Sequence, residues 1–241
     1  MDLDAWLIVC SALWGLCAGL LVPRAAYRLS VPPEENWRTT CPEGHPLGSW
    51  LGRARCPEGD RYGPGTTPVA VATALVTATL AAATGTRPEL AAWLLLAPIG
   101  ILLAVVDFSV QRLPDVLTLP LAATALALLG AAALLPEHAG TWLTALYGAL
   151  ALGAGYFVLF LINPNGMGFG DVKLAVALGA VLGWYGWPVV LLGTFAGFLF
   201  GALYGMGLVV VRRAGRKTSM PFGPFLLGGA FVGLVLGAYG A

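Results

Sequence analysis

Residues 90–106 read Leu-Ala-Ala-Trp-Leu-Leu-Leu-Ala-Pro-Ile-Gly-Ile-Leu-Leu-Ala-Val-Val, a run of seventeen residues without a charge, and Asp107 follows it directly. A helix of about 20 mostly apolar residues crosses the hydrocarbon core of a bilayer. Similar runs, each bounded by glycine, proline or charge, lie at about 6–22, 68–84, 117–135, 141–162, 172–186, 188–211 and 222–240. The runs predict an all-α polytopic membrane protein with about eight transmembrane helices.

The composition agrees with this fold class. Of the 241 residues, 58% are hydrophobic and 10% are charged, whereas a soluble domain carries roughly 25% charged residues. A soluble globular protein is therefore excluded. The formal net charge of +1 gives no indication of a nucleic-acid partner, so we expect the lipid bilayer to be the chain's main surroundings.

The basic residues predict the orientation, because loops on the cytoplasmic side are enriched in lysine and arginine. With eight crossings and the polar stretch 23–67 in the cytoplasm, only Arg87 of the thirteen basic residues lies outside. The others lie inside: Arg24, Arg28, Arg38, Arg53, Arg55, Arg61, Arg112, Lys173, Arg212, Arg213, Arg216 and Lys217. We therefore expect a first helix at 1–22, a cytoplasmic insert at 23–67, a seven-helix membrane domain at 68–241, and both termini outside.

Two carboxylates stand where the apolar runs meet the membrane surface. Asp107 ends the third run and Asp171 begins the sixth. These two runs cross in opposite directions, so the end of one and the start of the other lie at the same, cytoplasmic, face. An acid at membrane depth costs on the order of 3 kcal/mol on insertion, which makes it a functional candidate.

Such a pair suits acid–base catalysis of hydrolysis. Two neighbouring carboxyl groups do not lose both protons easily, so one can act as base on a water while the other protonates a peptide carbonyl. The two histidines, His45 and His138, fall in polar segments and leave no base at membrane depth for a serine or cysteine nucleophile. The structural alternative is that Asp171 is a helix-end acid favoured by the dipole and Asp107 a loop residue.

A rival from another functional class is a small membrane transporter or scaffold in which the acids bind a cation or a proton. Transporters usually hold such an acid near the bilayer midplane and often contain paired halves. This chain shows neither feature, so hydrolysis is favoured.

Three motifs in order resemble those of the type IV prepilin peptidases, membrane aspartyl proteases with a Gly-x-Gly-Asp motif. They are the Asp107 to Thr118 stretch, the Gly166 to Leu174 stretch and Pro221-Phe222-Gly223-Pro224-Phe225. The resemblance implies an aspartic endopeptidase of the bacterial cytoplasmic membrane, with Asp107 and Asp171 as catalytic residues and Gly168, Gly170 and Lys173 as motif support. It also implies that prepilins or pseudopilins lose their leader at the cytoplasmic face, without a cofactor for proteolysis.

Two smaller roles follow at these motifs. Lys173 is expected to help keep the Asp171 carboxylate ionised. Asp115 falls where the family usually has asparagine, and we expect it to be the N-cap of the next helix. In the first run, Cys10 and Cys17 share one helix face and are expected to be buried.

The insert departs from the family pattern. Members that also methylate the new N-terminus with S-adenosylmethionine carry two Cys-x-x-Cys pairs, and here each pair has lost one cysteine. The remaining candidates for a mixed zinc site are Cys41, His45, Cys56 and Asp60, although structural zinc prefers cysteine and histidine. With this ligand set we expect a poorly ordered insert with little apolar core, and cleavage with weak or absent methylation.

Overall fold

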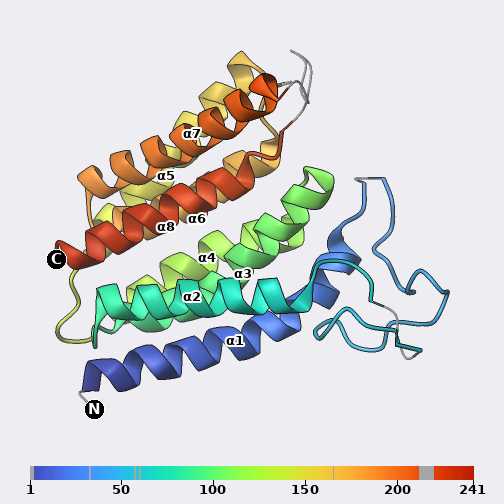
Figure 1. The fold of residues 1–241 in the computed structure, drawn as a ribbon. Coiled ribbons are helices and arrows are strands. Elements are labelled where there is room, and N and C mark those ends of the chain that lie inside the picture. The colour runs from blue at the N-terminus through green and yellow to red at the C-terminus, as the bar shows by residue number, and fades with distance from the viewer. Residues whose placement is uncertain (1–2, 33, 57, 60, 165, 212–219) are drawn as a thin grey trace.

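The computed structural model describes residues 3–32, 34–56, 58–59, 61–164, 166–211 and 220–241, and the described chain is helical (Figure 1). The helices are α1 (Leu3–Leu29), α2 (Thr66–Thr84), α3 (Glu89–Val110), α4 (Asp115–Ala132), α5 (Trp142–Ile162), α6 (Phe169–Gly183), α7 (Trp187–Val210) and α8 (Gly223–Tyr239). Within the described residues, β-structure is limited to two isolated bridges in the insert. The predicted all-α polytopic fold is confirmed.

Six of these helices, α1 to α5 and α7, are long and apolar enough to cross a membrane. The remaining two are shorter, with 15 residues in α6 and 17 in α8. α6 is buried along most of its length, from Asp171 to Gly183. A helix surrounded by protein need not match the bilayer thickness by itself, which accounts for its length.

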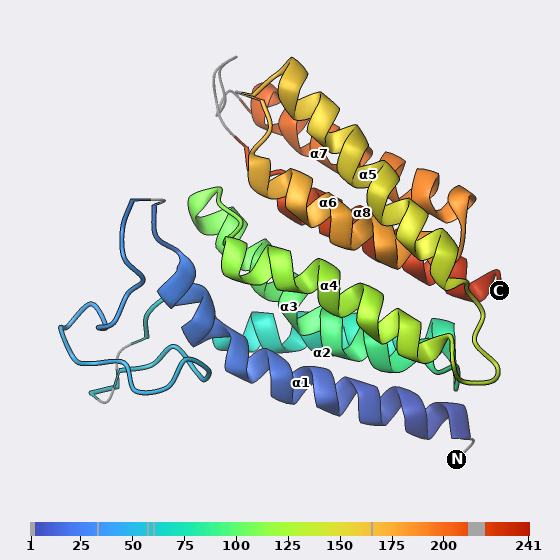
Figure 2. The same ribbon diagram turned by 180° about the vertical axis from the view of Figure 1, so that it is seen from behind.

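The helices form two groups of four (Figures 1 and 2). α1 to α4 lie together, α5 to α8 lie together, and the groups meet where α4 packs on α6 and where α8 packs on α2 and α3. The main hydrophobic core spans both groups, with Trp93, Leu129, Leu174 and Trp184 almost fully buried.

Glycines allow the closest helix contacts. Gly148 of α5 faces the backbone of Gly179 in α6, and Gly229 of α8 faces Gly193 and Gly197 of α7, so that a β-carbon on Gly229 would collide with backbone. Helices in lipid associate through such small residues because their backbones can approach. The second contact involves Gly197, one of a run of glycines spaced four apart in α7.

The first helix is longer than predicted. It continues through Pro23 to Leu29, so the insert begins at residue 30 and not at 23. Proline removes one helical hydrogen bond, but the final turns are held by the insert itself, where Arg24 bonds Ser49 and Arg28 bonds the Leu47 carbonyl. The expectation that Cys10 and Cys17 are buried is wrong, because both are exposed on α1.

The two ends of the molecule differ in content. The described parts of both termini lie at one end, and the insert, the end of α3 and the start of α6 lie at the other (Figures 1 and 2). Glu89, an acid that sequence reasoning passed over, is fully buried at the end with the termini. Its Oε1 accepts the Ala139 backbone N–H at 3.3 Å and the Tyr185 hydroxyl at 3.4 Å.

Candidate active site

Asp107 lies in the last turn of α3 and is 3% exposed. Its Oδ2 accepts a hydrogen bond of 2.9 Å from the backbone N–H of Gly223, the first residue of α8. The first N–H groups of a helix have no partner within that helix, so the start of α8 supplies a fixed donor. The carboxylate is thereby oriented by a helix that begins 116 residues further along the chain.

Asp171 lies in the first turn of α6 and is 6% exposed. Its Oδ2 accepts the backbone N–H of Gly168 at 3.1 Å, while its own N–H donates to the Gly168 carbonyl at 3.0 Å. Gly170 faces the α3–α4 loop, and a β-carbon there would lie 2.9 Å from Cβ of Leu113. The two motif glycines therefore have separate contacts, since Gly168 orients the acid and Gly170 lets α6 approach that loop.

The fold brings the two acids together at the end that carries the insert. Leu113 lies against the glycines beside both acids: a β-carbon on Gly223, the donor to Asp107, would lie 3.3 Å from the Leu113 side chain, and one on Gly170, next to Asp171, would lie 2.9 Å from Cβ of Leu113. Among the described residues, the ion pairs are His45 with Glu58 and Lys173 with Asp115, so neither of these buried acids has a basic partner there. A buried carboxylate pair without a counter-cation is suited to sharing a proton.

We expected Lys173 to help keep the Asp171 carboxylate ionised, but Lys173 pairs with Asp115 instead. Its Nζ lies 2.7 Å from Oδ1 of Asp115 and 4.9 Å from the centre of the Phe169 ring. The pair joins the starts of α4 and α6, and we find no ion pair between Lys173 and Asp171 in the described chain. Asp115 is itself the first residue of α4, so the N-cap position belongs to Pro114.

Sequence reasoning missed two contributors to the site. In the sequence Gly223 is recognisable only as part of a motif, because its role as hydrogen-bond donor to Asp107 depends on the tertiary structure. Tyr156 of α5 is buried, stacks on the Phe198 ring at 5.8 Å, and lies 6.5 Å from the ring of Phe222, which precedes Gly223. The sequence could have indicated Tyr156, because its hydroxyl lies within the apolar run 141–162 and polar groups at membrane depth are functional candidates.

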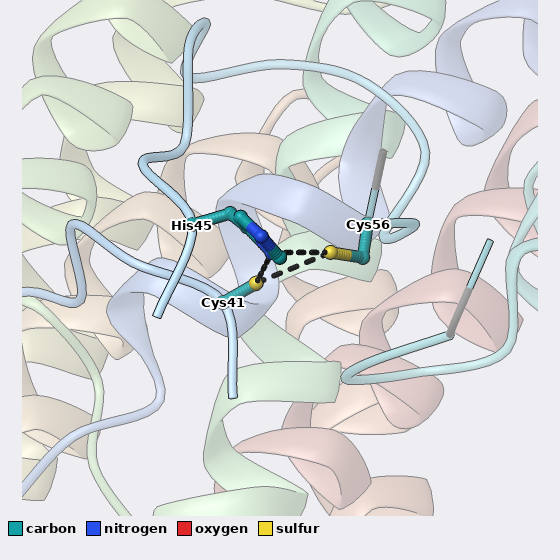
Figure 3. Close-up of side chains that lie close together, drawn as sticks. All are labelled: Cys41, His45 and Cys56. Carbon is teal, nitrogen blue, oxygen red and sulfur yellow. Dashed lines mark hydrogen bonds between the residues drawn. The ribbon is translucent and has the colours of Figure 1, made fainter. Parts of the chain in front are cut away.

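A second cluster lies in the insert, where Cys41, His45 and Cys56 converge (Figure 3). The Cys41 and Cys56 sulfurs are 3.3 Å apart, and Nδ1 of His45 lies 3.6 Å from the first and 3.1 Å from the second. Both cysteines begin a Cys-Pro-Glu-Gly repeat, at 41–44 and 56–59. Each repeat turns back so that its glycine N–H donates to the carbonyl of its cysteine, with φ of +86° at Gly44 and +103° at Gly59.

These three groups fit a zinc ion in donor type and spacing. Tetrahedral zinc with sulfur and nitrogen ligands sets its donors about 3.5–3.8 Å apart, close to the distances here. Nε2 of His45 also lies 3.2 Å from Oε1 of Glu58, and a carboxylate on the second nitrogen is the usual partner of a metal-bound histidine. The fourth candidate, Asp60, lies outside the described residues.

The members of the cluster shift one another's pKa values in different directions. The hydrogen bond with Cys41 and the charge of Glu58 raise the pKa of His45. Burial opposes ionisation of Cys41, yet its contacts with Cys56 and His45 lower its pKa. A backbone hydrogen bond at Glu58 favours the Cys56 thiolate, but burial and Cys41 raise the pKa of this thiol.

The expectation of a poorly ordered insert is wrong, because a small apolar core orders it. Cys41, Ala54, Cys56 and Tyr62 are buried against one another, and Leu47 packs against them. The Tyr27 ring at the end of α1 contacts the Tyr62 ring at 4.6 Å between centroids. Arg112 adds a link to the membrane domain by donating to the Pro32 carbonyl at 3.0 Å. The long first helix thus supplies part of the core that the insert lacks by itself.

Comparison with known proteins places these features in a family. Residues 94–206 match the model of the type IV leader peptidase family. A protein named prepilin leader peptidase/N-methyltransferase from Aeromonas hydrophila is 38% identical over 237 residues, covering 90% of this chain and 76% of that protein. Proteins of the same name from Aeromonas salmonicida and Pseudomonas aeruginosa are 37% and 29% identical, over 88% and 95% of this chain and 74% and 90% of theirs.

No solved structure matches this chain. The matched residues 94–206 contain both buried acids, the Gly-x-Gly-Asp motif and Tyr156. With relatives that align along most of both chains, the chain belongs to the type IV leader peptidase family, a family of proteases.

Proposed function

We propose that this protein is a membrane-embedded aspartyl endopeptidase that removes the leader from type IV prepilins or pseudopilins at the cytoplasmic membrane face. The observation that carries the proposal is the pair of buried acids at one end of the bundle, each oriented by a backbone N–H. Asp107 is held by Gly223 at 2.9 Å and Asp171 by Gly168 at 3.1 Å.

The pair would act on a water molecule and a peptide bond. The ionised carboxylate takes a proton from the water, whose oxygen attacks the carbonyl carbon, while the protonated carboxyl group gives its proton to the carbonyl oxygen. The intermediate then collapses: the base gives its proton to the leaving nitrogen, the C–N bond breaks, and one hydroxyl of the intermediate returns a proton to the other carboxylate, which leaves a carboxylic acid and an amine. The protein supplies burial, which excludes bulk water, and fixed positions for both carboxylates.

The described basic residues support the orientation. The insert and the nearby helix ends hold Arg24, Arg28, Arg38, Arg53, Arg55, Arg61, Arg112 and Lys173, and only Arg87 lies at the other end. Arg212, Arg213, Arg216 and Lys217, which also entered the prediction, lie outside the described residues. By the positive-inside rule, this distribution supports a cytoplasmic position for both acids and an outside position for both termini.

We further propose that Cys41, His45 and Cys56 hold a structural zinc ion in the insert, while proteolysis needs no cofactor. The relatives' names include N-methyltransferase, which suggests a second activity that would use S-adenosylmethionine, and we propose that this activity is weak or absent here. Two reasons led us to expect weak methylation: the missing cysteines and a poorly ordered insert. Because the insert has a small core, only the missing cysteines still support this expectation. The transporter alternative loses support, because both acids lie at helix ends.

Co-expression with a candidate prepilin tests the main proposal. The precursor should lose its leader with the wild-type protein and keep it with the Asp107→Asn variant. Equal processing by both proteins, at equal membrane levels, would refute the assignment of Asp107.

A further inference from the structure

Residues 49–53 of the insert, which we call the insert tip, fold back onto α1. The Gly52 N–H donates to the Leu21 carbonyl at 2.8 Å, and the Gly52 carbonyl accepts the Arg24 N–H at 3.0 Å. The Arg24 guanidinium also donates to Oγ of Ser49 at 2.7 Å and to the Arg53 carbonyl at 3.2 Å. Gly52 has a φ of +139°, and a β-carbon there would lie 3.2 Å from Cζ of Arg24. The close approach of the tip to the helix therefore requires glycine.

The insert tip lies at the level of the membrane surface. It contacts α1 at the point where the apolar run 6–22 ends. α1 and α2 are antiparallel (Figure 1), and a β-carbon on Gly19 would lie 2.7 Å from Cα of Ala70. By this register Thr66, the first residue of α2, lies opposite Pro23. Both helices thus pass from the bilayer to the insert at the level of the tip.

The tip covers the face of α1 that is exposed to lipid. Trp14, Cys17 and Leu21 are exposed. The steps of three and four residues between them place them on one helix face, and a further step of three leads to Arg24. α1 also lies at the edge of the bundle (Figures 1 and 2). The surroundings of the tip on this side are therefore the lipids next to α1.

The side chains of the tip suit the headgroup region of a bilayer. Trp50 is 44% exposed, and its ring contacts the ring of Trp37, 41% exposed, edge-on at 5.2 Å. Tryptophan is enriched at membrane interfaces because its ring is apolar and its N–H is polar. Residues 44–57 include two arginines and no acid. Within the described chain, neither Arg24 nor Arg53 forms an ion pair, so both charges are available to anionic headgroups.

We propose that the insert tip binds the headgroups of anionic phospholipids and so anchors the insert to the membrane surface beside α1. Trp50 and Leu51 lie among the headgroups, and the charges of Arg24 and Arg53 attract the phosphates. This region is hydrated, so aqueous reagents reach the tip from the side of the insert. The inference rests on the membrane fold and is independent of proteolysis.

A fluorescent amino acid at Leu51 tests the depth of the tip. The full-length protein is placed in vesicles of phosphatidylcholine and phosphatidylglycerol whose headgroups carry a nitroxide quencher. The control position is Glu35, which is exposed and whose N–H bonds the Pro32 carbonyl beyond the end of α1. We expect emission to be lost at position 51 and retained at position 35. Equal emission at the two positions would overturn the proposal.

A charge variant tests the headgroup. Binding of short-chain phosphatidylglycerol to the full-length protein in neutral detergent is followed by the emission at position 51. Arg53→Gln should raise Kd about fivefold, the contribution of one basic residue at an anionic surface. Arg61→Gln, which removes an equal charge from an exposed residue of the insert, should leave Kd unchanged. Equal binding of phosphatidylcholine, or displacement of the lipid by inorganic phosphate, would refute an anionic headgroup as the ligand.

Photo-crosslinking separates lipid from a protein partner. A photoreactive amino acid at Trp50 in the full-length protein should form adducts with phospholipid in cells that also express a candidate prepilin. The control is the same residue at Glu35, where we expect no lipid adduct. Adducts at position 50 with the prepilin or with a second copy of the chain, in place of lipid, would overturn the proposal. Because cleavage is not measured, failure of the proposed function would leave these results unchanged.

Discussion

The backbone N–H of Gly223 donates a 2.9 Å hydrogen bond to Oδ2 of Asp107, and this contact joins the start of α8 to the end of α3. Glycine is required here by space, because a β-carbon at 223 would lie 2.9 Å from that oxygen. The carboxy-terminal motif therefore acts on the acid through the backbone and contributes no reactive side chain of its own.

Gly223→Ala should displace the Asp107 carboxylate. Because a displacement of about 1 Å can cost about 10²-fold in rate, we expect kcat to fall by about that factor while the protein still inserts. The control is Gly207→Ala in α7, where a β-carbon meets nothing within 4 Å. Rates of leader removal by the purified proteins provide the measurement, and a wild-type kcat in Gly223→Ala would exclude a positioning role.

Asp107→Asn and Asp171→Asn should each abolish cleavage, since either change removes half of the acid–base pair; general acid–base catalysis contributes about 10²–10⁴-fold. Asp115→Asn should be mild, because Asp115 is an exposed partner of Lys173 and surface pairs contribute about 0–1 kcal/mol. Single-turnover cleavage in detergent separates these outcomes. Full activity of either buried-acid variant would refute the catalytic pair.

Zinc should co-purify with the wild-type chain and be lost from Cys41→Ser and Cys56→Ser. The matched controls are Cys10→Ser and Cys17→Ser, which change exposed cysteines of α1. Elemental analysis of the purified proteins gives the ratio of metal to chain. Absence of zinc from wild type purified without chelator, or its retention in both insert variants, would count against the site.

The pH dependence of zinc binding has a defined sign. Zinc binds the neutral imidazole and the thiolates, so protons compete with it. The pKa of His45 is raised by its contact with Cys41 and by Glu58, so its protonated form persists to higher pH than in a free histidine. Zinc affinity should therefore fall as the pH is lowered, and Glu58→Gln should weaken this fall. Metal release followed with a chelating dye between acidic and neutral pH measures it.

Labelling of single cysteines tests the orientation. Cys41 and Cys56 are buried, so a labelling reagent would reach them poorly from either side of the membrane. A cysteine introduced at Leu51, which is 55% exposed in the insert, is the better labelling site. In a chain whose native cysteines are replaced by serine, Leu51→Cys should escape an impermeant maleimide added to intact cells, while His138→Cys should react. The reverse pattern would place both buried acids at the outer face.

Methylation should be weak or absent, because two cysteines of the family's four are missing from the insert. Mass spectrometry of a prepilin processed by the purified enzyme with S-adenosylmethionine reads the result directly. We expect the mature N-terminus without an added methyl group. A stoichiometric gain of one methyl group, made by this enzyme alone, would show that Cys41, His45 and Cys56 suffice for an insert that supports the reaction.

Much of the architecture could be predicted because the bilayer constrains it locally. A crossing needs a run of apolar residues of set length, so the helices begin and end within a few residues of the runs, except α1, whose last turns pack against the insert up to Leu29. The basic residues orient the runs, and alternate crossings then place Asp107 and Asp171 at one end. The sequence by itself therefore determined the fold class and predicted the eight helices of the described chain, and it singled out the two acids as the candidate pair.

Only the tertiary structure decided which residues meet. Lipid-facing and helix-facing side chains are equally apolar, so lateral packing leaves no period in the sequence and depends on small residues and shape. The bond from Gly223 to Asp107 and the pairing of Lys173 with Asp115 join segments far apart in the chain. Convergence of Cys41, His45 and Cys56 likewise depends on a small core of insert residues, Ala54, Tyr62 and Leu47, that is completed by Tyr27 at the end of α1.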